Sequence, residues 1–180
     1  MTQENPKPKQ DDEIVYKGHL TLVRRLHEGK KFDVVVSKDA AAMLYIDEND
    51  IVYLAKQYRP AQEKELLEAP AETLDKPSLS PLEVMIEGLE EECGIKIGKN
   101  QVKYFGKLIS TSGHDTEKVH LFLAYGKGEK TKQRLEDSEK INVVKMPFDE
   151  LYKMVINNEV EGSKLSCMVM YEKLRRHGLI

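Results

Sequence analysis

The sequence has few cysteines and no long apolar run, and these absences argue against several classes of protein. Cys93 and Cys167 stand alone, without Cys-x-x-Cys or Cys/His spacing. Two isolated cysteines argue against a disulfide framework and against a structural zinc site. They are typical of proteins from a reducing compartment, so we expect a cytoplasmic protein. No apolar run approaches the roughly 18 residues of a membrane-spanning helix. Residues 1–13 are polar and lack the apolar core of a signal peptide, so we expect a disordered tail there.

The chain also has little net charge. Its 28 Lys and Arg residues nearly balance 31 Asp and Glu residues, which leaves a formal net charge of −3. This balance gives no strong attraction to nucleic acid or to an anionic membrane, and we expect neither as a partner. With 180 residues, of which 40% are hydrophobic, the chain is long enough for one domain with a substantial core.

Strand signals dominate the first third and the middle of the chain. Residues 14–38 contain β-rich runs around a turn signal at Gly29 and Lys30, and they predict a small N-terminal strand region. Two apolar runs follow, with Glu, Asn and Asp between them, and they predict a hairpin. Further strands are expected at 102–110, 118–126 and 141–146.

One helix is predicted over residues 80–93 by several signals. Ser80 is a favourable N-cap, Pro81 suits the first helical position, and Glu83 completes a capping box. Gly94 is placed to end the helix. Two more helices are expected to close the chain, from about residue 148 to 157 and from about residue 163. Strands in the middle, one inserted helix and two terminal helices predict an α+β fold.

The C-terminal end of the first helix carries three adjacent carboxylates, Glu90, Glu91 and Glu92. A run of like charges is most often a solvated face of a helix. Carboxylate oxygens are also the protein ligands that Mg²⁺ prefers, with waters and substrate phosphates as its other ligands. On these residues alone both interpretations stay open.

Motifs on both sides of this helix resemble those of a known family. The chain reads KQYRP at 56–60, EAPA at 68–71, TSGHDTE at 111–117 and VHLFLA at 119–124. In order and spacing they resemble the ADP-ribose and sugar-nucleotide pyrophosphatase branch of the Nudix superfamily, over roughly residues 40–176. The resemblance implies a Nudix-type α/β/α sandwich with a mixed sheet, formed by residues 39–180.

The resemblance also implies a site for ADP-ribose or another nucleoside diphosphate sugar, with Mg²⁺ as cofactor. The implied metal ligands are the backbone carbonyl of Ala71 and the carboxylates of Glu91 and Glu92. The implied substrate contacts are Arg59, Glu68 and Glu117, and Glu139 matches a loop that carries a water-activating base. Three of these residues have a plainer alternative: Arg59 as an ordinary charge at a strand end, Glu117 as a cap of its loop, and Glu139 as a loop charge.

The family's signature, GX5EX7REUXEEXGU, is damaged in this chain. Its leading glycine falls at Glu72 or Thr73, its first glutamate at Leu79, its arginine at Glu87, and a metal-binding glutamate at Gly88. We therefore expect weak Mg²⁺ binding, absent without substrate, and weak or lost hydrolysis.

Two alternatives stay open. One is a non-catalytic module that binds a nucleotide, a sugar nucleotide or a protein partner. The other is an active enzyme whose relocated metal site uses Glu72 or Glu87. Glu87 is a poor replacement, because it lies about 140° from Glu92 around the helix.

The N-terminal strand region suggests how the chain assembles. Residues 14–38 are strand-like and have little helix to cover them, and exposed sheet edges are generally paired or covered. In the resembled branch these strands pair two subunits. We therefore expect a homodimer whose pocket borrows residues from the partner subunit.

Overall fold

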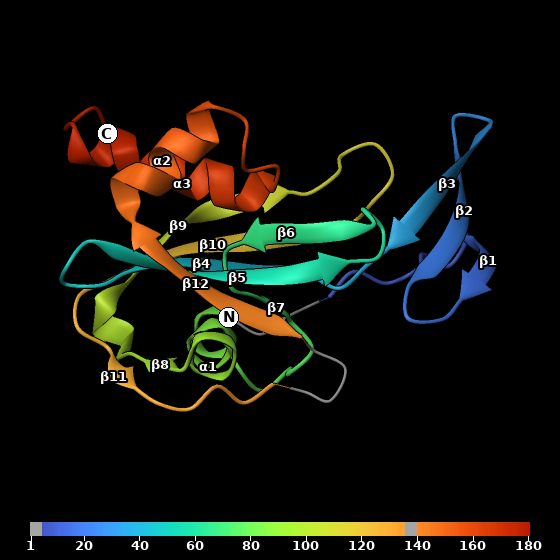
Figure 1. Ribbon diagram of the computed structural model, residues 1–180. Coiled ribbons are helices and arrows are strands. Elements are labelled where there is room, and N and C mark those ends of the chain that lie inside the picture. Colours follow the sequence, from blue (N-terminus) through green and yellow to red (C-terminus); the bar gives the residue numbers. More distant parts are fainter. Residues whose placement is uncertain (1–4, 136–139) are drawn as a thin grey trace.

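The computed structural model describes residues 5–135 and 140–180. Within these residues a seven-stranded sheet lies between helices, and a separate three-stranded sheet projects from one side (Figure 1). The elements, in chain order, are β1 (Glu13–Lys17), β2 (Thr21–His27), β3 (Lys30–Val36), β4 (Ala40–Ile46), β5 (Ile51–Arg59), β6 (Lys64–Glu68), β7 (Ala71–Thr73), α1 (Pro81–Cys93), β8 (Ile95–Lys96), η1 (Lys99–Gln101), β9 (Val102–Ile109), β10 (Lys118–Tyr125), β11 (Glu129–Lys130), β12 (Ile141–Pro147), α2 (Phe148–Ile156) and α3 (Ser163–Arg176).

The large sheet is mixed and is centred on β4. Its strand order is β12-β5-β4-β10-β9, with β6 beside β5 and β7 beside β4. Strands β4 and β10 run parallel, whereas β4–β5, β5–β12 and β9–β10 are antiparallel. Every residue of β4 is buried, as expected for a strand that is covered on both faces.

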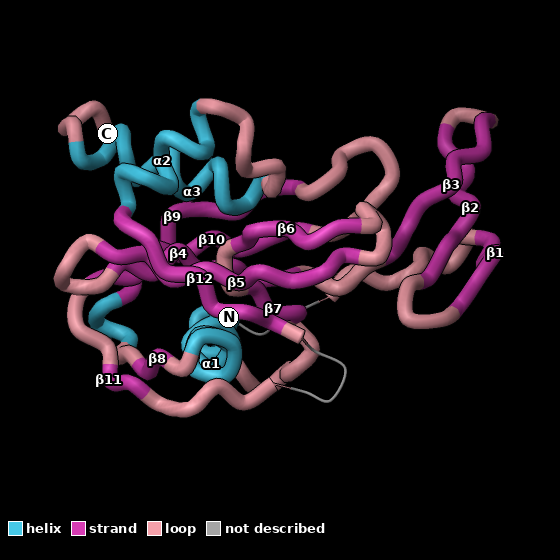
Figure 2. The backbone as a smooth tube through the Cα atoms, in the orientation of Figure 1, coloured by secondary structure: helices cyan, strands magenta, loops and turns pink. Residues whose placement is uncertain are grey.

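Side chains of β4 alternate between two cores, because successive residues of a strand point to opposite faces. Ala41, Met43 and Tyr45 pack with residues of α1. Ala40, Ala42, Leu44 and Ile46 pack with residues of α2 and α3. Helix α1 therefore covers one face of the sheet, and α2 with α3 covers the other (Figure 2). The α+β fold and the α/β/α sandwich with a mixed sheet are confirmed.

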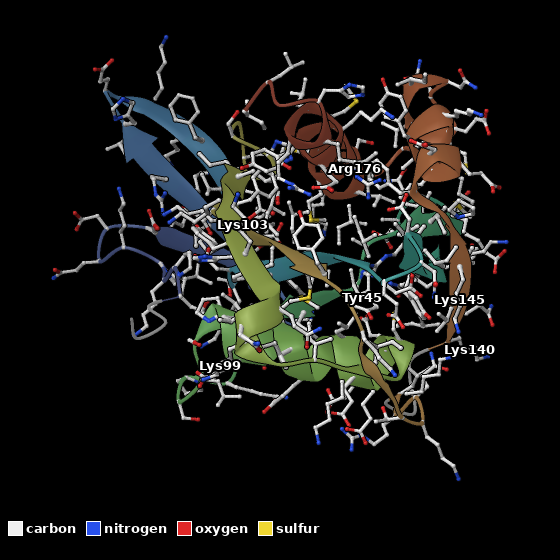
Figure 3. The ribbon with its side chains drawn as sticks, turned by 90° about the vertical axis from the view of Figure 1, so that its left-hand side faces the viewer. Tyr45, Lys99, Lys103, Lys140, Lys145 and Arg176 are labelled. Atoms are coloured by element: carbon white, nitrogen blue, oxygen red, sulfur yellow. The ribbon has the colours of Figure 1, made fainter. Side chains whose placement is uncertain are left out.

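Figure 3 locates the two layers by labelled residues. Tyr45 lies between the sheet and α1, and Arg176 lies on the opposite side of the sheet (Figure 3). The Tyr45 hydroxyl donates a hydrogen bond to the carbonyl of Gly126 at 2.7 Å. Burial raises the pKa of Tyr45 to about 12, so this phenol acts as a neutral core residue.

The predicted helix is confirmed together with its caps. The Glu83 amide donates to Ser80 Oγ at 3.3 Å, and the Ser80 amide donates to the Glu83 carboxylate at 2.8 Å. Lys99 also donates to Glu83, at 2.6 Å. The hydrogen bond from Lys99, followed by those from Ser80, lowers the pKa of Glu83 to about 2. Gly94 ends the helix with a φ of 64°, a conformation that favours glycine.

Most strands lie where the sequence predicts them, but β6, β7 and the two-residue strands β8 and β11 are additional. The sequence shows a loop-like motif at 68–71, whereas Glu68 ends β6 and Ala71 begins β7. Strand β6 is exposed at its first two residues, Lys64 and Glu65. Charged positions of this kind are typical of edge strands and weaken the alternating pattern from which strands are predicted.

The N-terminal region forms its own antiparallel sheet, β1-β2-β3. It is joined to the body by hydrogen bonds from the Val35 amide to the His114 carbonyl (2.7 Å) and from the Thr116 amide to the Val35 carbonyl (3.1 Å). The preceding segment also contacts the body, since the Asn5 side chain donates to the Leu74 carbonyl at 2.6 Å. Contacts therefore begin within the residues that we expected to be a disordered tail.

None of the helices in the described ranges combines the length and the hydrophobicity needed to cross a bilayer.

Candidate functional site

The candidate site is built where α1 packs against β7, a short strand that pairs with β4 (Figure 1). Gly88 and Glu92 are buried residues of α1. They lie one helical turn apart and therefore share a face of the helix. Glu92 is only 5% exposed, which is unusual for a carboxylate and marks this face as one that holds polar groups in the interior.

Glu72 of β7 lies directly over Gly88. A Cβ atom added at Gly88 would lie 2.5 Å from Glu72 Oε1 and 2.7 Å from Glu72 Cδ, and closer still to Cγ. Real side chains do not approach so closely, so any larger residue at position 88 would displace Glu72. The space above this turn of α1 is thus filled by a carboxylate that comes from the strand.

Two other carboxylates of the helix, Glu87 and Glu90, face cationic side chains. Glu87 accepts a hydrogen bond from Lys76 Nζ at 2.9 Å, and half of its side chain is exposed. Glu90 lies 3.6 Å from Arg134. Across residues 5–135 and 140–180, no three His, Cys, Asp or Glu side chains are close enough together to hold a metal ion.

The predicted base, Glu139, lies outside the described residues, whereas Gln133 before it and Ile141 after it are described. The Gln133 side chain donates to the Glu92 carbonyl at 2.8 Å and to the Ile141 carbonyl at 3.0 Å. Gln133 therefore joins the C-terminal end of α1 to the start of β12. The carbonyls at the end of a helix need such partners.

Two of the predicted substrate contacts, Arg59 and Glu68, are brought together. Arg59 Nε donates to Glu68 Oε2 at 2.6 Å, from the neighbouring strands β5 and β6. The Arg59 side chain is 40% exposed and that of Glu68 is 13% exposed. The guanidinium is thus held on one side and open to solvent on the other, which leaves donors for a ligand.

Glu117, the third predicted substrate contact, closes the turn between β9 and β10. Its carboxylate accepts a hydrogen bond from the Ser110 hydroxyl. Its amide donates to Asp115 Oδ1 at 3.0 Å. These contacts are what the plainer interpretation, a cap of the loop, requires.

A cleft of about 430 Å³ lies beside this turn. This cleft could not be predicted from the sequence, because the residues that line it are far apart along the chain. The charged residues that line it are Lys7, Lys9, Arg25, Asp39, Asp115 and Lys118. The Arg25 guanidinium is already paired with Asp12 at 2.7 Å. The cleft is therefore formed by residues of the N-terminal segment, such as Lys7 and Lys9, together with residues of the main body, such as Asp115 and Lys118.

Cys93 is excluded as a reactive thiol by its surroundings. It is 7% exposed and packs in the core between α1 and the sheet. Burial raises the pKa of the Cys93 thiol to about 12, so little thiolate forms at neutral pH.

Comparisons with known proteins agree with this architecture. No family model matches the chain. It is 26% identical to a methanol dehydrogenase activator of Bacillus methanolicus, over 81% of this chain and 77% of that protein. It is 26% identical to an ADP-ribose pyrophosphatase of Bacillus subtilis (strain 168), over 82% of this chain and 79% of that protein. The crystal structure of an ADP compounds hydrolase superposes with a TM-score of 0.73 and covers both chains completely, at 17% identity.

The chain is similar in sequence to an ADP-ribose pyrophosphatase and similar in fold to an ADP compounds hydrolase. This confirms the resemblance that the motifs indicated. The fold shared with the ADP compounds hydrolase includes the N-terminal sheet, because the superposition covers 100% of this chain.

Proposed function

We propose that this Nudix-type chain binds ADP-ribose or another nucleoside diphosphate sugar beside the C-terminal half of α1, and hydrolyses its diphosphate slowly or not at all. The substrate class is supported by the names of the B. subtilis relative and of the superposed hydrolase. The observation that carries the limit on hydrolysis is Gly88. It is a buried residue without a side chain at the helix position that the resemblance matches to a metal ligand.

The residues present suit Mg²⁺ when a diphosphate is bound with it. The donors are hard oxygens: the Glu91 and Glu92 carboxylates and the Ala71 carbonyl. Mg²⁺ is commonly held by one or two carboxylates together with substrate phosphates and water. Bound Mg²⁺ would neutralise negative charge on the diphosphate oxygens. With few protein ligands, we expect the ion to bind weakly unless the substrate is present.

The remaining residues have roles that follow from their contacts. Arg59, oriented by Glu68, would donate its open N–H groups to polar atoms of the sugar or base. Glu117 would keep the turn after β9 in shape. Glu139 would accept the proton of the water that attacks the diphosphate.

A non-catalytic role is the second candidate, and one comparison favours it. The relative from B. methanolicus is described as an activator of another enzyme. If this second candidate is correct, the chain binds a nucleotide sugar without cleaving it, or binds a protein partner.

The test is to measure binding and hydrolysis separately. Calorimetry with ADP-ribose measures binding, and phosphate-bond cleavage is followed across a panel of sugar nucleotides with Mg²⁺. Glu92→Gln removes a proposed ligand, and Glu87→Gln is the matched control on the same helix. Binding with slow, Glu92-dependent cleavage supports a weakened hydrolase. Binding without cleavage favours the non-catalytic candidate, and the absence of binding across the panel refutes the proposal.

Homodimer formation through the N-terminal sheet is part of the same proposal. Several large apolar side chains of the N-terminal region are exposed to solvent: Ile14, Val15, Tyr16, Leu20, Leu26 and Phe32. Exposed apolar side chains gathered on one small sheet are typical of an interface. Light scattering is expected to give a dimer, and Leu26→Asp with Phe32→Asp is expected to give a monomer. A wild-type monomer at working concentration would contradict the proposal.

A further inference from the structure

A glutamate and a glycine have exchanged places in this chain. The Nudix pattern has its leading glycine at Glu72 or Thr73 and a glutamate at Gly88. In the structure Glu72 lies over Gly88, in the volume that a side chain grown from residue 88 would fill. We infer that Glu72 of β7 supplies the carboxylate that α1 lacks, and that Glu72 and Glu92, rather than Glu91 and Glu92, are the two carboxylates that bind the divalent cation. This inference rests on the proposed nucleotide-sugar site.

The two departures from the pattern explain each other. Glu72 can lie against the helix only because Gly88 has no side chain, since an added Cβ would come within 2.5 Å of Glu72 Oε1. Conversely, a glycine inside a helix is unfavourable and is retained where a close approach needs it. Each substitution alone would harm the site or the packing, and the pair keeps a carboxylate beside the same helical turn.

Neighbouring carboxylates do not serve this purpose as well. Glu87 faces Lys76 at 2.9 Å, on the exposed side of the helix. Glu90 faces Arg134 at 3.6 Å. By contrast, Gly88 and Glu92 lie on one buried face, one turn apart, and Glu72 approaches that face from β7.

The small number of protein ligands suits a cation that binds together with its substrate. Two carboxylates are enough for Mg²⁺ if the diphosphate provides further oxygens. The described residues contain no cluster of three acidic or other metal-binding side chains, so the phosphate oxygens would complete the coordination. The exchange thus keeps the charge of the site while moving one ligand from the helix to the strand.

Thermal melting tests this inference with the full-length chain. The wild type, Glu72→Gln, the control Glu87→Gln, Gly88→Glu, and the swap Glu72→Gly with Gly88→Glu are melted with ADP-ribose alone and with ADP-ribose plus Mg²⁺. A ligand that binds the folded state raises the melting temperature. We expect Mg²⁺ to add a further rise in the wild type and in Glu87→Gln. In Glu72→Gln the apparent Mg²⁺ affinity should fall by more than about tenfold, since even indirect partners of metal ligands contribute about 10–100-fold.

The swap gives the sharpest outcome. Gly88→Glu alone should melt lower without metal, because its side chain collides with Glu72, whereas the swap should regain both the stability and the response to Mg²⁺. An unchanged Mg²⁺ response in Glu72→Gln overturns the inference, and so does a swap that fails to respond. If ADP-ribose binds to none of the variants, the proposed function fails. In that case the same variants are titrated with Mn²⁺ in the presence of inorganic diphosphate. A weaker Mn²⁺ affinity in Glu72→Gln than in the wild type and Glu87→Gln then supports the inference, and an equal affinity overturns it.

Discussion

Replacing Gly88 by alanine sets two effects of known size against each other. Alanine stabilises a helix interior by about 0.8–1.0 kcal/mol relative to glycine. Its Cβ would, however, lie 2.5 Å from Glu72 Oε1 and 2.7 Å from Glu72 Cδ. Forcing an extra carbon into a packed interior costs about 1–3 kcal/mol. We expect the overlap to prevail, with a net loss of about 1 kcal/mol in the free energy of unfolding.

The same substitution should have the opposite sign when Glu72 is shortened. In a Glu72→Ala background the overlap is removed and the helix preference remains, so Gly88→Ala should stabilise by about 0.8–1.0 kcal/mol. The coupling between the two sites is then about 1–3 kcal/mol, within the range found for residues in contact. Urea denaturation with EDTA present measures it, and melting should shift by about 2–4 °C per kcal/mol for a chain of this length.

Gly113→Ala is the matched control, because an added Cβ there meets no atom within 4 Å. Its effect should be the same in both backgrounds. If Gly88→Ala stabilises the wild type as much as the Glu72→Ala variant, Glu72 does not lie over the helix. The proposed exchange of ligands would then lose its geometric basis.

Three further predictions concern other parts of the molecule. Burial raises the pKa of Glu172, but hydrogen bonds from Arg175, Tyr125 and Arg176 outweigh it, so the pKa is lowered below 4.5. The stabilisation is therefore complete above pH 4.5 and is lost as the pH falls through the lowered pKa. Urea titrations should show wild type more stable than Glu172→Gln by about 1.5–3 kcal/mol at neutral pH, as for a hydrogen bond to a charged group, and this difference should close in acid. A thiol reagent should label the exposed Cys167 in the native protein, but should label the buried Cys93 only on unfolding; equal rates would contradict this. Arg59→Lys should weaken ADP-ribose binding by about tenfold in calorimetry, since a hydrogen bond to a charged group contributes about 1.5–3 kcal/mol; unchanged affinity would remove Arg59 from the site.

The parts of the fold that follow from local interactions could be predicted from the sequence. Ser80, Glu83 and Gly94 act within a few residues of one another, and they define both ends of α1 as the structure has them. The continuous apolar run at 40–46 likewise gives β4, because a short unbroken apolar run followed by a turn signal is typical of a strand that is buried on both faces. At α1 and at β4, the conformational preferences of residues close together in the chain were enough to predict the element.

The contacts that define the candidate site could not be predicted in this way. Helical geometry compares positions on one helix, so it could reject Glu87 as a replacement; it left Glu72 as an alternative but could not show that its side chain lies against Gly88. That residue lies on β7, and its approach to Gly88 depends on how β7 pairs with β4 and how α1 packs on the sheet. The ion pair between Arg59 and Glu68 similarly depends on the pairing of β5 with β6, a strand that the sequence did not indicate.

A damaged sequence signature and a lost metal site are therefore different things. A signature records which chain positions carry the ligands, whereas a cation responds only to the oxygens around it. Gly88 removes an oxygen donor from the helix, and Glu72 brings one to the same turn from another element. If the swap variant and the wild type bind Mg²⁺ equally, the family pattern is one of at least two ways to arrange the same charges. If only the swap binds it, Glu72 serves packing in this chain, and the fold has been kept for a role that does not need the metal.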